Sequence, residues 1–253
     1  EKRYHNLQES VRYTSACGGM IYQDRLLFPA EQTVAFTCEP FHNLVQALEL
    51  RDDGATFKAA RLGAEGEPDF FASSDRWCRP VMVRTGPDGA LWIADMYRYM
   101  IEHPQWLPKE GKEELLPHYR LGEDKGRIYR VIKQGENPRA IPDLSKLSTE
   151  ELVQQLHSTN AWIRDKAQQM LVWQSGASFQ PAQASKLLTP LCSAPLPQTR
   201  AQALHTLAIL GDLPAELLLQ ALRDSHPGVR ENALRLAESS TDPAVIAAAC
   251  ALV

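Results

Sequence analysis

The stretch Asp75–Arg98 constrains the fold more than any other part of the sequence, because it carries the signals of a β-hairpin. Val81–Val83 is a short run of strand-forming residues, and Leu91–Ile93 is a second one. Between them lies Gly86–Gly89, in which the Asp-Gly pair favours the positive φ angles of a tight turn. Polar residues follow the second run, and loops at strand ends commonly present a functional site. The sequence therefore predicts two antiparallel strands that lead to a polar strand end.

Similar short strands fill the sequence on both sides of this hairpin. A second Asp-Gly pair at Asp53–Gly54 joins two of them. The further candidate strands are Val11–Thr14, Gly19–Tyr22, Val34–Thr37, Leu44–Leu50, Thr56–Leu62, Asp69–Ala72 and Arg127–Lys133. Strands at such short intervals are typical of an all-β module, and a hairpin with charged ends is typical of one blade of a β-propeller. We therefore expect residues 1–137 to form a β-propeller portion, with an insertion loop near 99–123 that holds one or two helical turns.

A change of composition divides the chain after this β module. Gln134–Pro142 contains Gly, Asn and Pro residues, and we expect a linker over 138–147. Residues 141–253 are rich in Ala and Leu and poor in aromatic residues, which favours helices. Three similar segments surround Arg164, Arg200 and Arg230, with spacings of 36 and 30 residues. This period predicts an α-solenoid of HEAT-type repeats over 148–253, in which the arginines stabilise the turns.

Composition and charge bound the classes of function. The 253 residues carry a net charge of −4, so binding to nucleic acid or to an anionic membrane has no electrostatic support. Hydrophobic residues make up 44% of the chain, enough for a sizeable core, but no apolar run reaches the length of a membrane span. The five cysteines form no CxxC pair, so neither a zinc ribbon nor a covalently attached haem is indicated.

Four segments together resemble one family: Cys38–Val45, Trp77–Arg98, Ile101–Pro108 and Asp124–Val131. They are similar to parts of the exported, membrane-bound dehydrogenase-like proteins of planctomycetes and verrucomicrobia, which resemble soluble sugar dehydrogenases that use pyrroloquinoline quinone. The resemblance implies the last blades of a propeller followed by HEAT repeats. It also implies oxidation of a sugar or alcohol with pyrroloquinoline quinone and calcium as cofactors, a c-type cytochrome as electron acceptor, and an exported or periplasmic, membrane-associated location.

The same resemblance implies roles for several residues. His42 is the candidate base that takes the alcohol proton, because a neutral imidazole suits that role; a hydrogen bond between neighbouring blades is the alternative. Asn43, Arg79 and Arg84 are candidates for binding the quinone and its carboxylates. Arg79 and Arg98 also belong to the expected catalytic set. For each arginine, an ion pair with an aspartate is the alternative.

Asp95, Glu102 and His103 form the candidate metal site, and Asp95 is also part of the expected catalytic set. Oxygen-rich ligands of this kind suit calcium. Their spacing matches no recognised metal-binding loop, so structural hydrogen bonding is the alternative.

The implied export makes Cys17 and Cys38 the best disulfide candidates, because both lie near the ends of neighbouring predicted strands. Two buried free cysteines are the alternative, since cysteine spacing fixes no connectivity. If the prediction holds, their Cα atoms lie within about 7 Å of each other.

The number of predicted strands leads to one further expectation. Residues 11–133 supply strands for about two or three blades, whereas a propeller closes with roughly four to eight. We therefore expect upstream blades to be missing and this chain alone not to bind the quinone in a one-to-one ratio. The alternative function is a non-catalytic scaffold, in which the blades and the repeats bind proteins or glycans.

Overall fold

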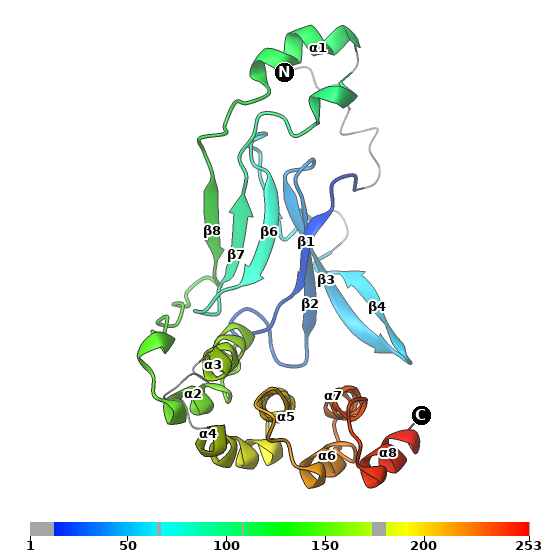
Figure 1. Cartoon of the computed structure of the whole chain (residues 1–253). Coiled ribbons are helices and arrows are strands. Elements are labelled where there is room, and N and C mark those ends of the chain that lie inside the picture. The colour runs from blue at the N-terminus through cyan, green and yellow to red at the C-terminus, as the bar shows by residue number, and fades with distance from the viewer. Residues whose placement is uncertain (1–12, 65–66, 108, 174–180, 253) are drawn as a thin grey trace. The chain divides into compact units, whose positions relative to one another are not determined.

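The chain forms two compact units, Glu1–Ala140 and Ile141–Val253. The computed structural model describes residues 13–64, 67–107, 109–173 and 181–252 (Figure 1). Every described strand belongs to the first unit, here called the β unit, while the second unit contains helices alone among its described residues and is called the helical unit. The predicted order of β structure followed by helices is therefore confirmed. The division between the units falls inside the segment expected as a linker.

The first sheet of the β unit is an antiparallel meander with one short added strand. Its order is β1-β2-β3-β4, and β5 also pairs with β3. The strands are β1 Cys17–Ile21, β2 Thr33–Glu39, β3 Leu44–Asp53, β4 Thr56–Arg61 and β5 Phe71–Ala72. Gly54 adopts φ 66° in the turn between β3 and β4, which confirms the hairpin expected at this Asp-Gly pair.

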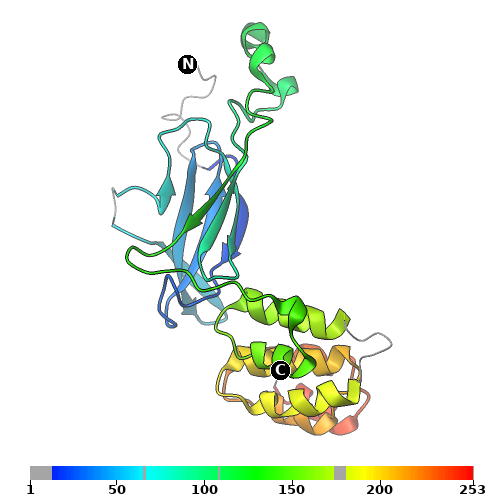
Figure 2. The ribbon, with the colours of Figure 1, turned by 90° about the vertical axis from the view of Figure 1, so that its left-hand side faces the viewer.

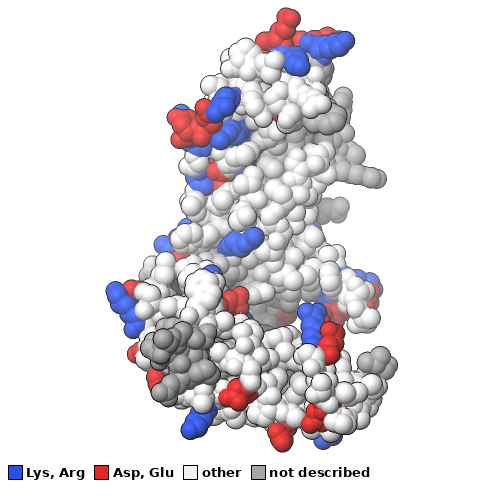
Figure 3. All heavy atoms as spheres, viewed as in Figure 1, with Lys and Arg blue, Asp and Glu red and all other residues white. Residues whose placement is uncertain are grey.

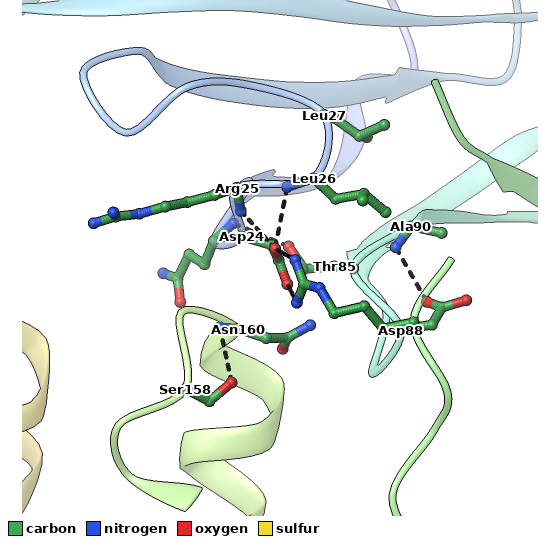
Figure 4. Close-up of polar contacts among 12 residues, drawn as sticks. Asp24, Arg25, Leu26, Leu27, Thr85, Asp88, Ala90, Ser158 and Asn160 are labelled. Carbon is green, nitrogen blue, oxygen red and sulfur yellow. Dashed lines mark hydrogen bonds and ion pairs between the residues drawn. The ribbon is translucent and has the colours of Figure 1, made fainter. Parts of the chain in front are cut away.

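The second sheet consists of the predicted central hairpin and one further strand. Its order is β6-β7-β8, with both pairs antiparallel. The strands are β6 Pro80–Thr85, β7 Leu91–Asp95 and β8 Arg127–Val131. Asp88 holds the β6–β7 turn, because its fully buried carboxylate accepts hydrogen bonds at 3.1 Å from the backbone N–H of Ala90 and from Nε1 of Trp92 (Figure 4 shows the first). Gly89 supplies the positive φ, 86°, that the turn requires.

A buried apolar core joins the two sheets. The residues that form it are Tyr22, Val34, Phe36, Cys38, Val45, Ala47, Val83, Leu91 and Ile93. They alternate along β2, β3 and β7, as expected for strands with one buried face. Neither sheet closes on itself, and no closed propeller ring is formed by the described residues. The two open sheets are what the structure shows, and the β-propeller remains a prediction.

The insertion between β7 and β8 carries the short helices expected there. They are η1 Pro104–Trp106, α1 Lys109–Leu115 and η2 Leu116–His118. In both Figure 1 and Figure 2 this insertion extends beyond one end of the strands of the β unit.

One predicted strand is wrong in its described part. Thr14 lies in a bend, and the first strand begins only at Cys17; Val11 lies outside the described residues. The physical reason is that Glu39 binds this segment, since its carboxylate oxygens accept hydrogen bonds from the backbone N–H of Ser15 at 3.1 and 3.2 Å. A side chain thus takes the donor that a strand partner would otherwise use.

The helical unit consists of two layers of short helices. Figure 1 shows α3, α5 and α7 in one layer and α2, α4, α6 and α8 in the other. The elements are η3 Leu144–Lys146, α2 Thr149–Gln155, α3 Ala161–Trp173, α4 Pro181–Leu188, η4 Thr189–Ser193, α5 Pro197–Ile209, α6 Ala215–Ala221, α7 Pro227–Ala237 and α8 Pro243–Cys250. Leucines from successive helices, such as Leu156, Leu171, Leu207 and Leu222, fill a continuous core between the layers. This is the packing that stacked helix pairs need to bury their apolar faces.

Local sequence signals fix where these helices begin. Ser148 caps α2 in a capping box with Glu151, as its side chain accepts from the Glu151 N–H and the Glu151 carboxylate accepts from the Ser148 N–H. Proline occupies the first turn of α5, α7 and α8, where its missing N–H costs nothing. The helical domain was expected to begin near Ser148, and α2 begins at the next residue.

The repeated arginines stabilise the turns of the array, as predicted. Arg164 Nη1 donates to the Ser158 carbonyl at 2.7 Å. Arg200 Nη1 donates to a preceding turn carbonyl at 2.8 Å, and its Nε and Nη2 bind the two carboxylate oxygens of Asp224, each at 2.7 Å. Arg230 Nη1 donates to the backbone carbonyl of Asp224 at 2.8 Å. Asp224 therefore links two successive repeats through both its side chain and its backbone.

The Arg200–Asp224 ion pair predicts a pH-dependent contribution to stability. Its hydrogen bonds hold the pKa of Asp224 below the usual value. A lowered folded pKa stabilises the protein above the unfolded pKa, about 3.9, and this stabilisation is lost as the pH falls through the folded value. We expect Asp224→Asn to destabilise the helical unit by about 1–2 kcal/mol at pH 7, and the difference from the unaltered chain to shrink below about pH 4.

Urea unfolding followed by far-ultraviolet circular dichroism at pH 7 and pH 3 measures this difference. Asp212→Asn is the matched control, because Asp212 is an exposed carboxylate of the same unit. A penalty for Asp224→Asn that is the same at both pH values would show that the ionised pair contributes nothing.

Two surface properties complete the description. No helix among the described residues is long and apolar enough to cross a membrane. On the face drawn in Figure 3, Lys and Arg side chains are interspersed with Asp and Glu and form no continuous basic patch. This distribution agrees with the weak negative net charge and gives a polyanion no extended site on this face.

Candidate functional site

Arg79 lies at the centre of the polar strand ends, but its guanidinium is used by the protein backbone. The residue is 2% exposed. Its Nε donates to the carbonyl of Arg98 at 3.1 Å, its Nη1 to that of Pro40 at 2.9 Å, and its Nη2 to that of Tyr99 at 3.0 Å. Arg79 thereby ties the loop after β2 to the loop after β7. These three hydrogen bonds account for the position of its guanidinium, and a role in binding a carboxylate stays a prediction.

Asp95 supports the same strand end. Its Oδ1 accepts hydrogen bonds from the backbone N–H of Arg79 at 2.6 Å and of Tyr97 at 2.8 Å. Tyr97 adopts φ 53°, which is uncommon for a residue with a side chain, and this hydrogen bond helps to hold it there. A buried carboxylate that accepts two backbone donors needs no metal to be stabilised.

The structure does not bring the predicted metal ligands together. Glu102 accepts from the N–H of Ile101 at 3.1 Å, and Nδ1 of His103 accepts from the N–H of Gln105 at 3.2 Å, where it caps η1. In the described part of the chain, no group of three His, Cys, Asp or Glu side chains could hold a metal ion. Asp95, Glu102 and His103 instead form separate structural hydrogen bonds, which was the alternative, and calcium binding stays a prediction.

His42 forms a pair with a buried carboxylate. Its Nδ1 lies 3.4 Å from Oε1 of Glu39. The His42 side chain is 15% exposed, and the Glu39 side chain is fully buried. The ring also packs near Tyr13 and Phe41. A carboxylate at Nδ1 orients an imidazole, so the pair could accept a proton or bind a polar group.

Asn43, expected to bind the cofactor, instead supports the backbone. It adopts φ 61°, and its Nδ2 donates to the carbonyls of Arg76, at 3.3 Å, and Cys78. Asparagine tolerates this left-handed conformation better than most residues. The amide therefore fixes the chain that leads into β6.

The guanidinium groups of Arg84 and Arg98 also donate to backbone carbonyls. Arg84 is exposed, and its Nη1 donates to the carbonyl of Val83 at 2.7 Å. Arg98 donates to the carbonyls of Met96, at 3.1 Å, and Gly122, which fastens the insertion to the end of β7. The arginines expected to bind the quinone, Arg79 and Arg84, and Arg98 of the expected catalytic set thus all donate to backbone carbonyls, and their roles toward a ligand stay predictions.

A cavity of about 330 Å³ beside Arg98 was not predicted. Its lining consists of Met96, Arg98, Met100, Ile101, Tyr119, Arg120 and Glu123. The lining combines apolar side chains with charged ones, which suits a small amphiphilic group.

Polar side chains of α3, α5 and α7 form hydrogen bonds between neighbouring helices of this layer. Nε2 of Gln202 donates to Oδ1 of Asp165 at 3.2 Å and to Oε1 of Gln168 at 2.7 Å. Nε2 of His205 lies 2.8 Å from Oδ1 of Asn232. We call these five residues the amide ladder. Its hydrogen bonds link α3 to α5 and α5 to α7. The periodicity of the sequence did not predict these contacts.

Comparison with known families adds to this geometry. A family model described as Domain of unknown function (DUF7133) matches residues 1–135. The chain belongs to this family. A second model, described as HEAT repeats, matches residues 149–238. No curated protein and no solved structure matches the chain.

The DUF7133 region contains both sheets and the insertion, and it ends shortly after β8. The HEAT match begins at the first residue of α2 and reaches the end of α7, which confirms the HEAT repeats predicted from the sequence. Neither description names a reaction, a substrate or a cofactor.

Proposed function

We propose that the chain is a protein-binding scaffold in which the α3–α5–α7 layer of the helical unit receives the partner. The observation that carries the proposal is a pair of exposed apolar side chains at equivalent repeat positions. Trp173 and Ile209 each lie nine residues after the aligned arginine of their repeat, and they are 72% and 58% exposed. Large apolar side chains in such positions are typical anchors of protein interfaces.

The amide ladder supports the same assignment. Ile209 lies four residues after His205 and seven after Gln202, so the three side chains share one face of α5. Side-chain amides both donate and accept hydrogen bonds, and their mutual contacts hold them in fixed orientations. An apolar anchor beside preorganised polar groups matches the organisation of an interface core and its rim.

Oxidation of a sugar or alcohol is the second candidate, and the His42–Glu39 pair is the observation that favours it. The residues around this pair do not fit a tricarboxylate quinone with calcium. Arg79 is fully engaged with carbonyl groups, Arg84 donates to the Val83 carbonyl, and the acidic residues expected to hold calcium are not clustered. These observations favour the protein-binding scaffold over the dehydrogenase.

Partner binding tests the proposal directly. The chain is immobilised, retained proteins are identified, and the purified partner is titrated against the free chain by calorimetry. We expect the double variant Trp173→Ala/Ile209→Ala to weaken binding at least ten-fold, or about 1.4 kcal/mol. Ile246→Ala is the matched control, since Ile246 is 45% exposed on α8, in the other helix layer, and should leave the affinity unchanged.

Two results would overturn the scaffold assignment. One is that no protein is retained, or that the double variant binds the partner as tightly as the unaltered chain. The other is saturable one-to-one binding of pyrroloquinoline quinone in the presence of calcium, accompanied by sugar-dependent dye reduction. The second result would favour the dehydrogenase, and it should then be lost in His42→Ala.

A further inference from the structure

Two cysteines of the β unit face each other across neighbouring strands. Cys17 of β1 and Cys38 of β2 are direct partners in the antiparallel register. Opposed residues in such a pair have Cα atoms about 4.5–5.5 Å apart, which lies within the range that a disulfide spans. The separation expected from the sequence is therefore confirmed. Both thiols are free in the structure.

An irregularity in β1 creates this pairing. Met20 pairs with Phe36, and continuing that register without interruption would place Glu39 opposite Cys17. The register shifts between Cys17 and Met20, so Cys38 takes the place of Glu39. Bulges of this kind re-aim side chains and require a permissive backbone. Gly18, at φ 60°, provides it.

We propose that Cys17 and Cys38 form a disulfide site that closes when the chain meets a disulfide oxidant. The Cys17 thiolate attacks the oxidant's S–S bond, forms a mixed disulfide and releases one thiol. The Cys38 thiolate then attacks the Cys17 sulfur and releases the second thiol. The chain gives up two electrons and two protons, and the oxidant becomes two thiols. Cys17 is the entry point, because it is half-buried while Cys38 is fully buried.

The environment of the two thiols affects how fast the disulfide forms and what it does to the sheet. Burial raises the pKa of Cys17 and raises that of Cys38 to about 12, so closure should be faster at alkaline pH. The bridge would fasten β1 to β2, whereas now the Cys17 thiol donates only a weak hydrogen bond to the Val81 carbonyl at 3.4 Å. Disulfide oxidants of this class belong to exported compartments, the location that the family resemblance implied.

The test uses the full chain and oxidised glutathione at pH 8 under native conditions. Before blocking, the oxidised chain should be lighter than the reduced chain by two hydrogens, and after free thiols are blocked it should carry two blocking groups fewer. Trypsin cuts after Arg25, between the two cysteines, so the map should contain one peptide pair joined through Cys17 and Cys38. The oxidised chain should also unfold roughly 5–10 °C higher than the reduced chain.

Single substitutions identify the site. Cys17→Ser and Cys38→Ser should each abolish the linked peptides, while Cys250→Ser, which removes the exposed cysteine of α8, should leave them unchanged. Should Cys38→Ser fail to fold, Cys17→Ser still decides the question, because Cys17 is the less buried thiol. The proposal is overturned if both thiols remain open to alkylation after oxidation, if Cys38 bridges to another cysteine, or if the link forms only in urea. None of these outcomes depends on partner binding by the helical unit.

Discussion

Replacing Arg79 with methionine is expected to destabilise the β unit by about 3 kcal/mol or more. Its buried guanidinium donates to the carbonyls of Pro40, Arg98 and Tyr99, and each carbonyl left without a donor costs about 1–3 kcal/mol. Methionine preserves much of the length and the apolar contact of the side chain, so the loss reports the hydrogen bonds and the charge. Arg79→Lys should restore only a fraction, because an ammonium cannot reach three carbonyls with the geometry of the guanidinium.

Arg84→Met is the matched control for this prediction. Arg84 lies on β6, the strand that begins directly after Arg79, and it is exposed and donates to the neighbouring Val83 carbonyl, so its replacement should change stability by less than about 0.5 kcal/mol. Hydrogen exchange of the backbone amides of β6 and β7 measures the effect within the β unit, independently of the helical unit. Equal exchange rates in the two variants would mean that Arg79 is not the central tie between the loops after β2 and β7.

The elements that could be predicted from the sequence are those fixed by neighbouring residues. The Asp-Gly pairs specify their hairpins because positive φ angles are needed at Gly54 and Gly89 themselves. The HEAT repeats are equally visible, because each helix pair repeats its own apolar pattern and its own arginine. Thr14 shows the limit, since a residue distant in the chain, Glu39, binds the segment in which a strand was expected.

The roles of the candidate site residues depended on contacts between distant segments. The carbonyls that Arg79 binds are 39, 19 and 20 residues away, and nothing near Arg79 in the sequence identifies them. The polar character of the strand end could therefore be predicted, and structural hydrogen bonding was foreseen as the alternative for Asp95, whereas the particular carbonyls that Arg79 binds could not be identified. The His42–Glu39 pair was more accessible to prediction, because its members are only three positions apart in the sequence.

The proximity of the two cysteines depends on register in the same way. Cysteine spacing left a bridge and two free thiols open, and a one-residue shift in β1 decides which side chain faces Cys38. Gly18 is the residue that permits this shift. It also allows β1 to approach the second sheet, because a Cβ at this position would lie 2.6 Å from the carbonyl oxygen and 2.8 Å from the Cα of the facing β6 residues.

Gly18→Ala should therefore destabilise the β unit by about 2–4 kcal/mol, through positive-φ strain of about 1 kcal/mol and a collision with backbone atoms that cannot rotate away. Gly54→Ala separates the two terms. Gly54 has a similar φ of 66°, but a Cβ there would meet nothing within 4 Å, so only the strain should remain. Urea unfolding followed by hydrogen exchange in β1 and β6 measures both variants. If the two alanine variants lower the free energy of unfolding equally, β1 and β6 are not in direct backbone contact. If Gly18→Ala lowers it more, as expected, this variant should also slow closure of the Cys17–Cys38 bridge, because it displaces β1.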